Sequence, residues 1–381
     1  MSNIGTWAQR VAQDWLVLEL TNNDAAMLGL VTAMQFLPAM LLSLYGGLLA
    51  DRFSKRKLLI LTNTGAGLAS VFLGLLVVTE SVQLWHVFAL ALLLGIFTAI
   101  DSPIRVSFTS ELVGKDDLAN AVSLNSANFN VGRLVGPALS GYLIFYFGTG
   151  PSFLINTVTY VFMVSTLLFI RDKDLHITVK PAKENKLAEA LTYVRSRPDL
   201  MLVMTVVFFT TTFGLNFQIF IALMATKEFN MGPDQFGALG SMLAVGSLSG
   251  ALLAARLEQH RTTKNILRGA AFFGVLLMVC AYIPNPIVFA IMLPIMGATA
   301  LLTLISANSY VQSNTTNALR GRVIGIYILI FMGGTPIGAP LIGFVAAVIG
   351  IRPTVVLCGL VLLIAALVIR SRFKNLKPIT V

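Results

Sequence analysis

Apolar residues along this chain form long, nearly continuous runs, and short polar turns separate one run from the next. The runs are about 20 residues long, which is the length that a helix needs to cross the hydrocarbon core of a bilayer. A membrane β-barrel would instead alternate apolar and polar positions along each strand. We therefore expect an all-α membrane protein with twelve helical spans, at 1–20, 25–50, 57–79, 83–104, 118–147, 150–170, 200–226, 235–255, 266–283, 286–312, 322–349 and 353–370.

The composition indicates that the lipid bilayer is the solvent of these helices. Hydrophobic residues make up 56% of the 381 residues and charged residues only 12%, about half the charged fraction of a typical soluble domain. Cys280 and Cys358 each lie inside an apolar run, so we interpret them as small buried hydrophobes. The three histidines are far apart in the sequence, and we predict no metal site and no cofactor.

One long polar segment, from Arg171 to Asp199, divides the predicted spans into two sets of six. It is rich in lysine and arginine, and it contains an amphipathic stretch near 187–194. The domains that we predict are a first bundle at 1–171, a cytoplasmic linker at 172–199, a second bundle at 200–370 and a cytoplasmic tail at 371–381.

The loop charges predict the orientation of the chain. Of the 27 lysines and arginines, 23 lie in the loops after even-numbered spans or in the tail, whereas Lys227 and Arg352 lie on the other side and Arg10 and Arg133 lie inside spans. By the positive-inside rule, the basic face and both termini are cytoplasmic. Because the net charge of +10 is spread over alternate loops, it does not indicate a nucleic-acid partner.

Two blocks of sequence recur at almost the same distance along the chain, which indicates an internal repeat. Gly132, Gly136, Gly141 and Gly148 recur 202 positions later as Gly334, Gly338, Gly343 and Gly350, and the block at 46–52 recurs 204 positions later at 250–256. Gly5 and Gln9 also match Gly214 and Gln218, but the seventh span begins well before Gly214. We therefore expect the first helix to be truncated at its N-terminus by about ten residues, or ~15 Å at the helical rise.

The sequence motifs resemble those of one transporter family. The segment 47–57 (GLLADRFSKRK) is similar to the cytoplasmic signature of the major facilitator superfamily, with Ser54 in place of the usual glycine, and 132–141 (GRLVGPALSG) is similar to its exporter-associated motif. The segments 5–7 (GTW), 101–103 (DSP), 118–125 (LANAVSLN) and 320–323 (RGRV) resemble the macrolide-efflux and enterobactin-exporter subfamily, which is of the drug:proton antiporter type.

The resemblance implies the major facilitator fold, in which two six-helix bundles are related by a pseudo-twofold axis and alternate access to a central cavity. It implies proton-driven export of a small molecule, such as a drug, a macrolide or a siderophore-like compound. We expect a monomer in the bacterial cytoplasmic membrane, with protons as the coupling ion.

Three charged residues lie well inside predicted spans: Arg10, Asp14 and Arg133. Charges at that depth cost a few kcal/mol and normally face a cavity or a partner. Arg10 and Asp14 are one helical turn apart, so one interpretation is a structural pair between helices. The other is that Asp14 is the proton-coupling carboxylate, because low dielectric favours its neutral form and Arg10 favours its charged form. Two bases against one acid favour an anionic or catechol-like substrate over a cationic drug.

Uncharged polar residues complete the candidate substrate cavity. They are Gln9, Gln13, Asn130, Asn216, Gln218 and Asn308. Amide side chains in spans either hydrogen-bond a substrate or join neighbouring helices, and the sequence leaves both roles open.

The cytoplasmic signature predicts a gate. We expect Asp51 and Arg52 to pair with charges on neighbouring helices, such as Asp101, Arg320 or Arg322, in contacts weak enough to break during transport. The gate residues are Gly47, Asp51, Arg52, Lys55, Arg56, Asp101, Arg320 and Arg322. The exporter motif, with Gly132, Gly136, Pro137 and Gly141, provides close packing and a kink, and it is also expected to seal the outer side.

The alternative functions are an importer or uniporter on the same fold, and a membrane-embedded enzyme or assembly factor. The enzyme is disfavoured because no span carries a nucleophile or metal constellation. A primary pump is disfavoured because the sequence has no GxxxxGK[ST] phosphate loop.

Overall fold

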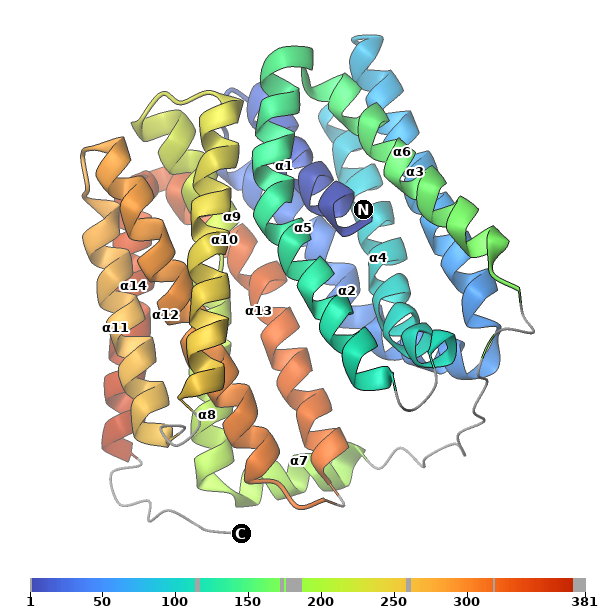
Figure 1. Ribbon diagram of the computed structural model, residues 1–381. Helices are drawn as coiled ribbons and strands as arrows, with labels where there is room; N and C mark the ends of the chain where they lie inside the picture. Colours follow the sequence, from blue (N-terminus) through green and yellow to red (C-terminus); the bar gives the residue numbers. More distant parts are fainter. Residues whose placement is uncertain are drawn as a thin grey trace. The chain divides into compact units, whose positions relative to one another are not determined.

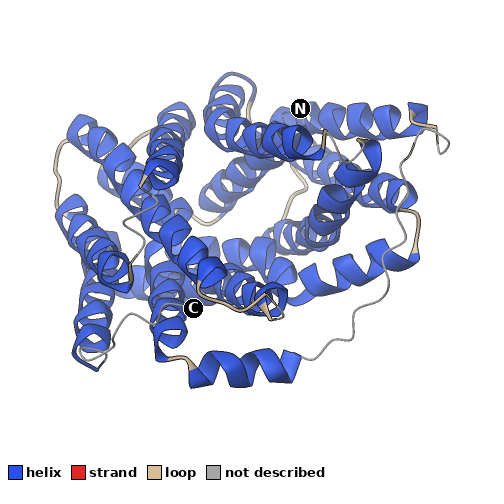
Figure 2. Ribbon diagram, turned by 60° about the horizontal axis from the view of Figure 1, so that its bottom comes forward, coloured by secondary structure: helices blue, strands red, loops and turns tan. Residues whose placement is uncertain are grey.

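The computed structural model describes residues 2–113, 117–171, 175, 187–257, 262–317 and 319–372, and within these ranges all regular structure is helical (Figures 1 and 2). The first half of the chain forms six long helices: α1 (Ser2–Leu20), α2 (Ala25–Arg52), α3 (Lys55–Val78), α4 (Leu84–Leu112), α5 (Leu118–Phe147) and α6 (Thr149–Phe169).

The second half begins with the short helix α7 (Leu187–Ser196) and a seventh span that is broken into four pieces: α8 (Pro198–Phe209), the π-helical turn η2 (Thr210–Gly214), α9 (Phe217–Leu223) and a second π-helical turn η3 (Met224–Glu228). It continues with α10 (Pro233–Arg256), α11 (Thr263–Ala281), α12 (Pro286–Ser313), α13 (Arg320–Ile349) and α14 (Ile351–Arg372).

The chain divides into two compact units. Unit 1 comprises Met1–Pro181 and Ile221–Ser241, and unit 2 comprises Ala182–Phe220 and Met242–Val381. Within unit 1, α2 packs against α4, α3 against α6, and α1 against α5 and α6 (Figure 1). Within unit 2, α11 packs against α12 and α14, and α13 packs against η2.

The predicted all-α membrane architecture is confirmed. Each of the twelve predicted spans is occupied by helix, and ten helical segments among the described residues are long and apolar enough to cross a membrane. The other two, α1 and α5, are the helices that carry Arg10, Asp14 and Arg133. Large apolar side chains on the outer faces of both units are exposed, as helices solvated by lipid require.

The predicted end of the fourth span is wrong. We expected that helix to end near residue 104, whereas α4 continues to Leu112 with Pro103 in its interior. Arg105 pairs with Asp101 one turn earlier and Glu111 pairs with Lys55, so the charges after Pro103 are neutralised within the bundle. Paired charges let the helix continue where the sequence suggested a loop.

The internal repeat has a structural counterpart in the glycines. Gly148 ends α5 with φ 81° and Gly350 ends α13 with φ 85°, a backbone conformation that favours glycine. Gly95 on α4 lies against the backbone of α2, and Gly297, 202 positions later, lies against the backbone of α10. Equivalent helices in the two halves therefore meet at equivalent small residues.

The stretch near 187–194 that was predicted to be amphipathic forms α7. This helix lies in the C-terminal part of the polar segment. Ala190 and Val194 are buried in the hydrophobic core of unit 2, whereas Glu189 and Arg195 are exposed. Residues 172–174 and 176–186 of that segment lie outside the described residues, as does 373–381 of the predicted tail. The predicted domain boundaries stay a prediction.

Candidate functional site

A row of polar side chains on α1 is buried inside unit 1. Gln9 is 2% exposed, and Gln13 and Asp14 are 0% exposed. Their neighbours along the helix, from Val11 to Leu18, are buried as well, so α1 is surrounded by other helices at this depth. The sequence predicted these three residues as site candidates, and the structure brings them together on one buried helix.

Gln35 on α2 provides the hydrogen bonds for two of these residues. Its Nε2 donates to Gln13 Oε1 and to Asp14 Oδ1, each over 3.2 Å. Four polar atoms of the cluster remain without a hydrogen-bond partner, namely Asp14 Oδ2, Gln35 Oε1, Gln13 Nε2 and Gln9 Nε2. Sequence reasoning missed Gln35, although a lone glutamine in the middle of an apolar span was the available signal.

Asn156 on α6 contacts the same row one turn earlier. Its Nδ2 donates to Gln9 Oε1, and its Oδ1 accepts from Thr159 Oγ1 over 3.0 Å. Gly5 permits this approach, because a Cβ there would collide with Asn156 and Thr159. α1 is therefore joined to α2 and to α6 by amide side chains.

Two guanidinium groups lie over the indole ring of Trp7. The Cζ of Arg10 is 5.2 Å from the Trp7 ring centroid and 4.5 Å from that of Phe36, and the Cζ of Arg133 is 5.9 Å from Trp7. Phe129 meets Trp7 edge-on with the ring centroids 5.9 Å apart. Both arginines are half-buried, and neither has an ion pair among the described residues. The structural Arg10–Asp14 pair considered from the sequence is not formed.

The exporter motif on α5 is a contact surface for two other helices. A Cβ on Gly132 would lie 2.8 Å from Asn3, and one on Gly136 would lie 2.6 Å from Trp7 Cβ, both on α1. On the other side, Gly141 faces the first turns of α10, and Gly237 of α10 faces Pro137. Nearby, Asn130 is half-buried on α5.

The uncharged candidates of the second half lie in different surroundings. Asn216, 1% exposed at the break after η2, donates from Nδ2 to Thr212 O over 2.7 Å, and its Oδ1 has no partner. Gln218 is half-buried on α9. Asn308 accepts from Gln312 over 2.6 Å and lies near the end of α12. Only Asn216 is a buried amide with an unpaired atom, so these residues do not form a row like that of α1.

Some of the predicted gate residues of unit 1 form ion pairs or hydrogen bonds with neighbouring helices, and others do not. Lys55 pairs with Glu111, and Arg56 donates to Leu167 O over 2.7 Å. Asp51 and Arg52 are exposed and have no ion pair among the described residues of unit 1, and no described atom lies within 4 Å of a Cβ built on Gly47.

Asp101 pairs with Arg105 over 2.7 Å and accepts from Asn63 and Thr62 over 2.7 and 2.9 Å. The acid that we predicted as a partner for Arg52 is therefore already bound within its own helix bundle. The pairing predicted for Asp51 and Arg52 stays a prediction.

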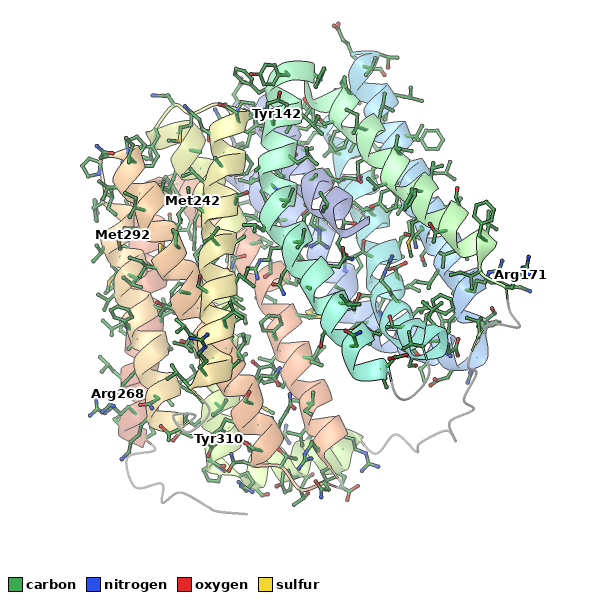
Figure 3. All side chains as sticks on the ribbon, in the orientation of Figure 1. Tyr142, Arg171, Met242, Arg268, Met292 and Tyr310 are labelled. Carbon is green, nitrogen blue, oxygen red and sulfur yellow. The ribbon has the colours of Figure 1, made fainter. Side chains whose placement is uncertain are left out.

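In unit 2, a network at the base of the bundle holds α7 in place. Arg322 pairs with Glu189 of α7 over 3.0 Å. Arg197 makes a two-pronged contact with buried Asp199 over 2.9 and 2.8 Å, and Tyr310, labelled in Figure 3, donates to Asp199 over 3.2 Å. The hydrogen bonds to Asp199 raise the pKa of Arg197. Arg320 lines a shallow hollow of about 280 Å³ with Ser309, Gln312 and Ser313.

The described helices form a multi-pass α-helical membrane protein, and its fold is the major facilitator fold. A bacterial homologue of the human lysosomal transporter Spinster, in an inward-facing and occupied conformation, superposes with a TM-score of 0.78 at 14% identity, covering 99% of this chain and 98% of the other. The nucleoside transporter NupG superposes with a TM-score of 0.74 at 14% identity, covering 98% of each chain.

The family follows from the sequence. A family profile described as transmembrane secretion effectors, of the major facilitator superfamily, matches residues 1–379, and the chain belongs to that family. The staphyloferrin A transporter of Staphylococcus aureus is 24% identical, covering 94% of this chain and 90% of its own length. The enterobactin exporter of Shigella flexneri is 23% identical (87% and 81%), and the multidrug efflux pump Tap of Mycolicibacterium fortuitum is 24% identical (94% and 90%).

Proposed function

We propose that this protein exports a small amphipathic molecule in exchange for protons, and that Asp14 carries the proton. One observation supports this role above the others: Asp14 is a carboxyl group with 0% exposure whose Oδ2 has no hydrogen-bond partner. A buried carboxylate with one neutral donor and no cation is disfavoured, so the charged form is favoured only in a conformation that admits water or a cation. Loss of the proton is thereby tied to conformational change.

The surroundings of Trp7 support an electron-rich substrate. A cation–π contact contributes about 0.5–2 kcal/mol, whereas a guanidinium at the centre of a span costs about 2.5–3.5 kcal/mol on insertion scales. The aromatic contacts of Arg10 and Arg133 therefore offset only part of their burial. A carboxylate or a catechol-like ring placed beside these arginines would offset the remaining cost of burying their guanidinium groups.

The relatives agree with this substrate class in part. Two of them are named for the siderophores staphyloferrin A and enterobactin, and a third is named as a multidrug efflux pump. We propose that the protein works as a monomer in the bacterial cytoplasmic membrane, with both termini in the cytoplasm. Its two halves alternate access to a central cavity, and the charged residues at the cytoplasmic ends of the helices form the gate.

The test begins with a thermal-shift screen of purified protein against siderophores, macrolides and simple aromatic anions. The compound that stabilises the protein most is then followed in inside-out membrane vesicles with an acidic interior. We expect wild-type protein to accumulate the compound only while the proton gradient lasts, and an Asp14→Asn variant to lose this accumulation.

The matched control is Glu19→Gln on the same helix, because Glu19 is exposed at the other end of α1 from the predicted gate and accepts from Trp15 and Thr149. This variant is expected to transport like wild-type protein. Proton-driven accumulation that survives in Asp14→Asn would remove Asp14 from the role, and uptake into right-side-out vesicles would reverse the proposed direction.

A further inference from the structure

We infer that Asp14 binds its proton as one half of a carboxylic acid–amide pair with Gln35, which makes Gln35 the residue that positions the coupling proton. The inference deepens the proposed function and rests on it, since it describes how the proposed proton site is built. It depends on the hydrogen-bond capacity of two buried side chains that face each other from α1 and α2.

The donors of Gln35 are fully used. An amide side chain has two N–H groups and one carbonyl oxygen. One N–H of Gln35 is directed at Gln13 Oε1 and the other at Asp14 Oδ1, each over 3.2 Å. The orientation of the Gln35 amide is thus fixed from two sides, and its carbonyl oxygen is the one group that remains.

The acceptors on both sides are unpaired. Asp14 Oδ2 and Gln35 Oε1 are both buried, and neither has a hydrogen-bond partner. They belong to the two groups that the Gln35 Nε2–Asp14 Oδ1 hydrogen bond already joins, and buried acceptors without donors are rare in folded proteins. A single proton on Asp14 Oδ2 satisfies both at once, because the acid O–H then donates to Gln35 Oε1 while the Gln35 N–H donates to Asp14 Oδ1.

The position of Arg10 supports the neutral acid. Arg10 is one turn before Asp14, and a carboxylate there would attract it. Its guanidinium instead lies over the rings of Phe36 and Trp7, and Arg10 has no ion pair among the described residues.

The other charged or titratable groups on the helices packed against α1 are Tyr45, Asp51 and Arg52 on α2, His86, Asp101, Arg105 and Glu111 on α4, Arg133, Tyr142 and Tyr146 on α5, and Tyr160 on α6. Tyr45, Asp51, Arg52, Tyr142 and Tyr146 are exposed, and Glu111 pairs with Lys55. Arg133 lies against Trp7, and Asp101 and Arg105 neutralise each other, so none of these cations pairs with Asp14.

The pair also connects proton release to helix movement. Its two halves stand on different helices, so a shift of α2 relative to α1 breaks both hydrogen bonds together. The proton then leaves Asp14 Oδ2 for water, and the carboxylate is free to attract Arg10. Gln13 accepts the second hydrogen bond of the Gln35 amide and so fixes its orientation. It is therefore a secondary positioning residue.

The test is infrared difference spectroscopy of the purified full chain in lipid, over a pH series. A protonated carboxyl group gives a carbonyl stretching band that a carboxylate lacks. We expect wild-type protein to show a carboxylic-acid band at neutral pH, Asp14→Asn to lose it, and Glu19→Gln to keep it. The band belongs to Asp14 if it disappears only in the first variant.

Gln35→Leu then tests the pair itself. Removal of the amide frees the acid from its hydrogen bonds, so the band is expected to shift to higher frequency, with a smaller shift in Gln13→Leu. Gln35→Asn, which keeps the amide but is one methylene shorter, serves as a second variant if Gln35→Leu fails to fold, and the same shift is expected.

The possible outcomes separate this inference from the proposed function. An Asp14 band that does not move in either Gln35 variant overturns the acid–amide pair and leaves Asp14 as a proton carrier. A wild-type protein with no Asp14 carboxylic-acid band at neutral pH overturns the pair as well. Uncoupled transport in wild-type vesicles overturns the proposed function, whatever the spectra show.

Discussion

The first helix α1 and the broken seventh span occupy equivalent positions in the internal repeat, but the hydrogen-bond partners of their buried polar side chains differ. In unit 1, α1 meets α5 at Gly136, which contacts Trp7. In unit 2, η2 meets α13 at Gly338, which contacts Thr212 and Asn216. Asn216 is 209 positions after Trp7, the same offset that relates Gly5 to Gly214.

The glycine contacts of the two regions are alike, but the hydrogen-bond partners of their buried polar side chains are not. The buried groups of α1 find amides on other helices, as Asp14 does with Gln35 and Gln9 does with Asn156. In the seventh span the buried donors that are bonded use their own backbone: Thr211 donates to Val207 O and Asn216 to Thr212 O, whereas Thr210 Oγ1 and Thr212 Oγ1 have no partner. Side chains that compete for backbone carbonyls favour a locally widened helix, as in η2.

The difference indicates a division of roles between the two regions. A charge inside a span needs partners from neighbouring helices, so relative movement of those helices changes its protonation. A donor that is bonded to its own helix backbone keeps that hydrogen bond in any arrangement of the neighbouring helices, and such side chains give the helix a place to bend. We propose that unit 1 holds the proton and that the seventh span bends without taking part in proton transfer.

The largest effect on stability is expected at Gly338. A Cβ there would collide with the backbone oxygen of Thr212, which cannot move without disturbing η2. We expect Gly338→Ala to destabilise the protein by about 1–3 kcal/mol, the usual cost of overpacking, measured as a lower melting temperature in detergent. Gly325→Ala on the same helix is the control, because no described atom lies within 4 Å of its Cβ position. Equal melting temperatures for the two variants would contradict the close packing of Gly338 against η2.

A smaller loss is expected at Gly136, the equivalent position in unit 1. Its new Cβ would meet Trp7 Cβ at 2.6 Å and the backbone of Ile4 and Ala8 at 3.1 Å. The helix α1 can shift by a few tenths of an ångström to relieve the contact, so we expect Gly136→Ala to cost about 1 kcal/mol, the low end of overpacking. A loss larger than that of Gly338→Ala would show that α1 is held more rigidly than the seventh span.

The smallest effect is expected at Asn216. Its hydrogen bond is local, and such polar contacts inside membrane bundles contribute about 0.6 kcal/mol on average. Asn216→Ala should therefore lower the melting temperature only slightly and leave the pH dependence of transport unchanged. A change in that pH dependence would mean that the seventh span takes part in the proton step.

The sequence predicted most of the fold because lipid imposes a simple rule. Spans are long, apolar and helical, and the ends of α5, α6 and α12 agree with the predictions within about two residues. The end of α4 could not be predicted from composition, since it depends on Arg105 meeting Asp101 and Glu111 meeting Lys55. The break at Thr210–Gly214 was also missed, because a run of three threonines is compatible with a regular helix.

The candidate site was predicted only in part. A charged residue inside a span is conspicuous, so Arg10, Asp14 and Arg133 were found directly. The hydrogen-bond partners of Asp14 and Gln9 were not found, because Gln35 and Asn156 are separated from α1 in sequence and only the packing of α2 and α6 brings them near.

The central claim is that the proton-binding group of this transporter is Asp14 in unit 1. The most direct measurement is proton release, followed with a pH indicator in lightly buffered detergent solution, when the most stabilising compound of the thermal-shift screen binds. The account predicts that wild-type protein and Asn216→Ala release protons on binding and that Asp14→Asn releases none. Release by Asp14→Asn equal to that of wild-type protein would contradict it.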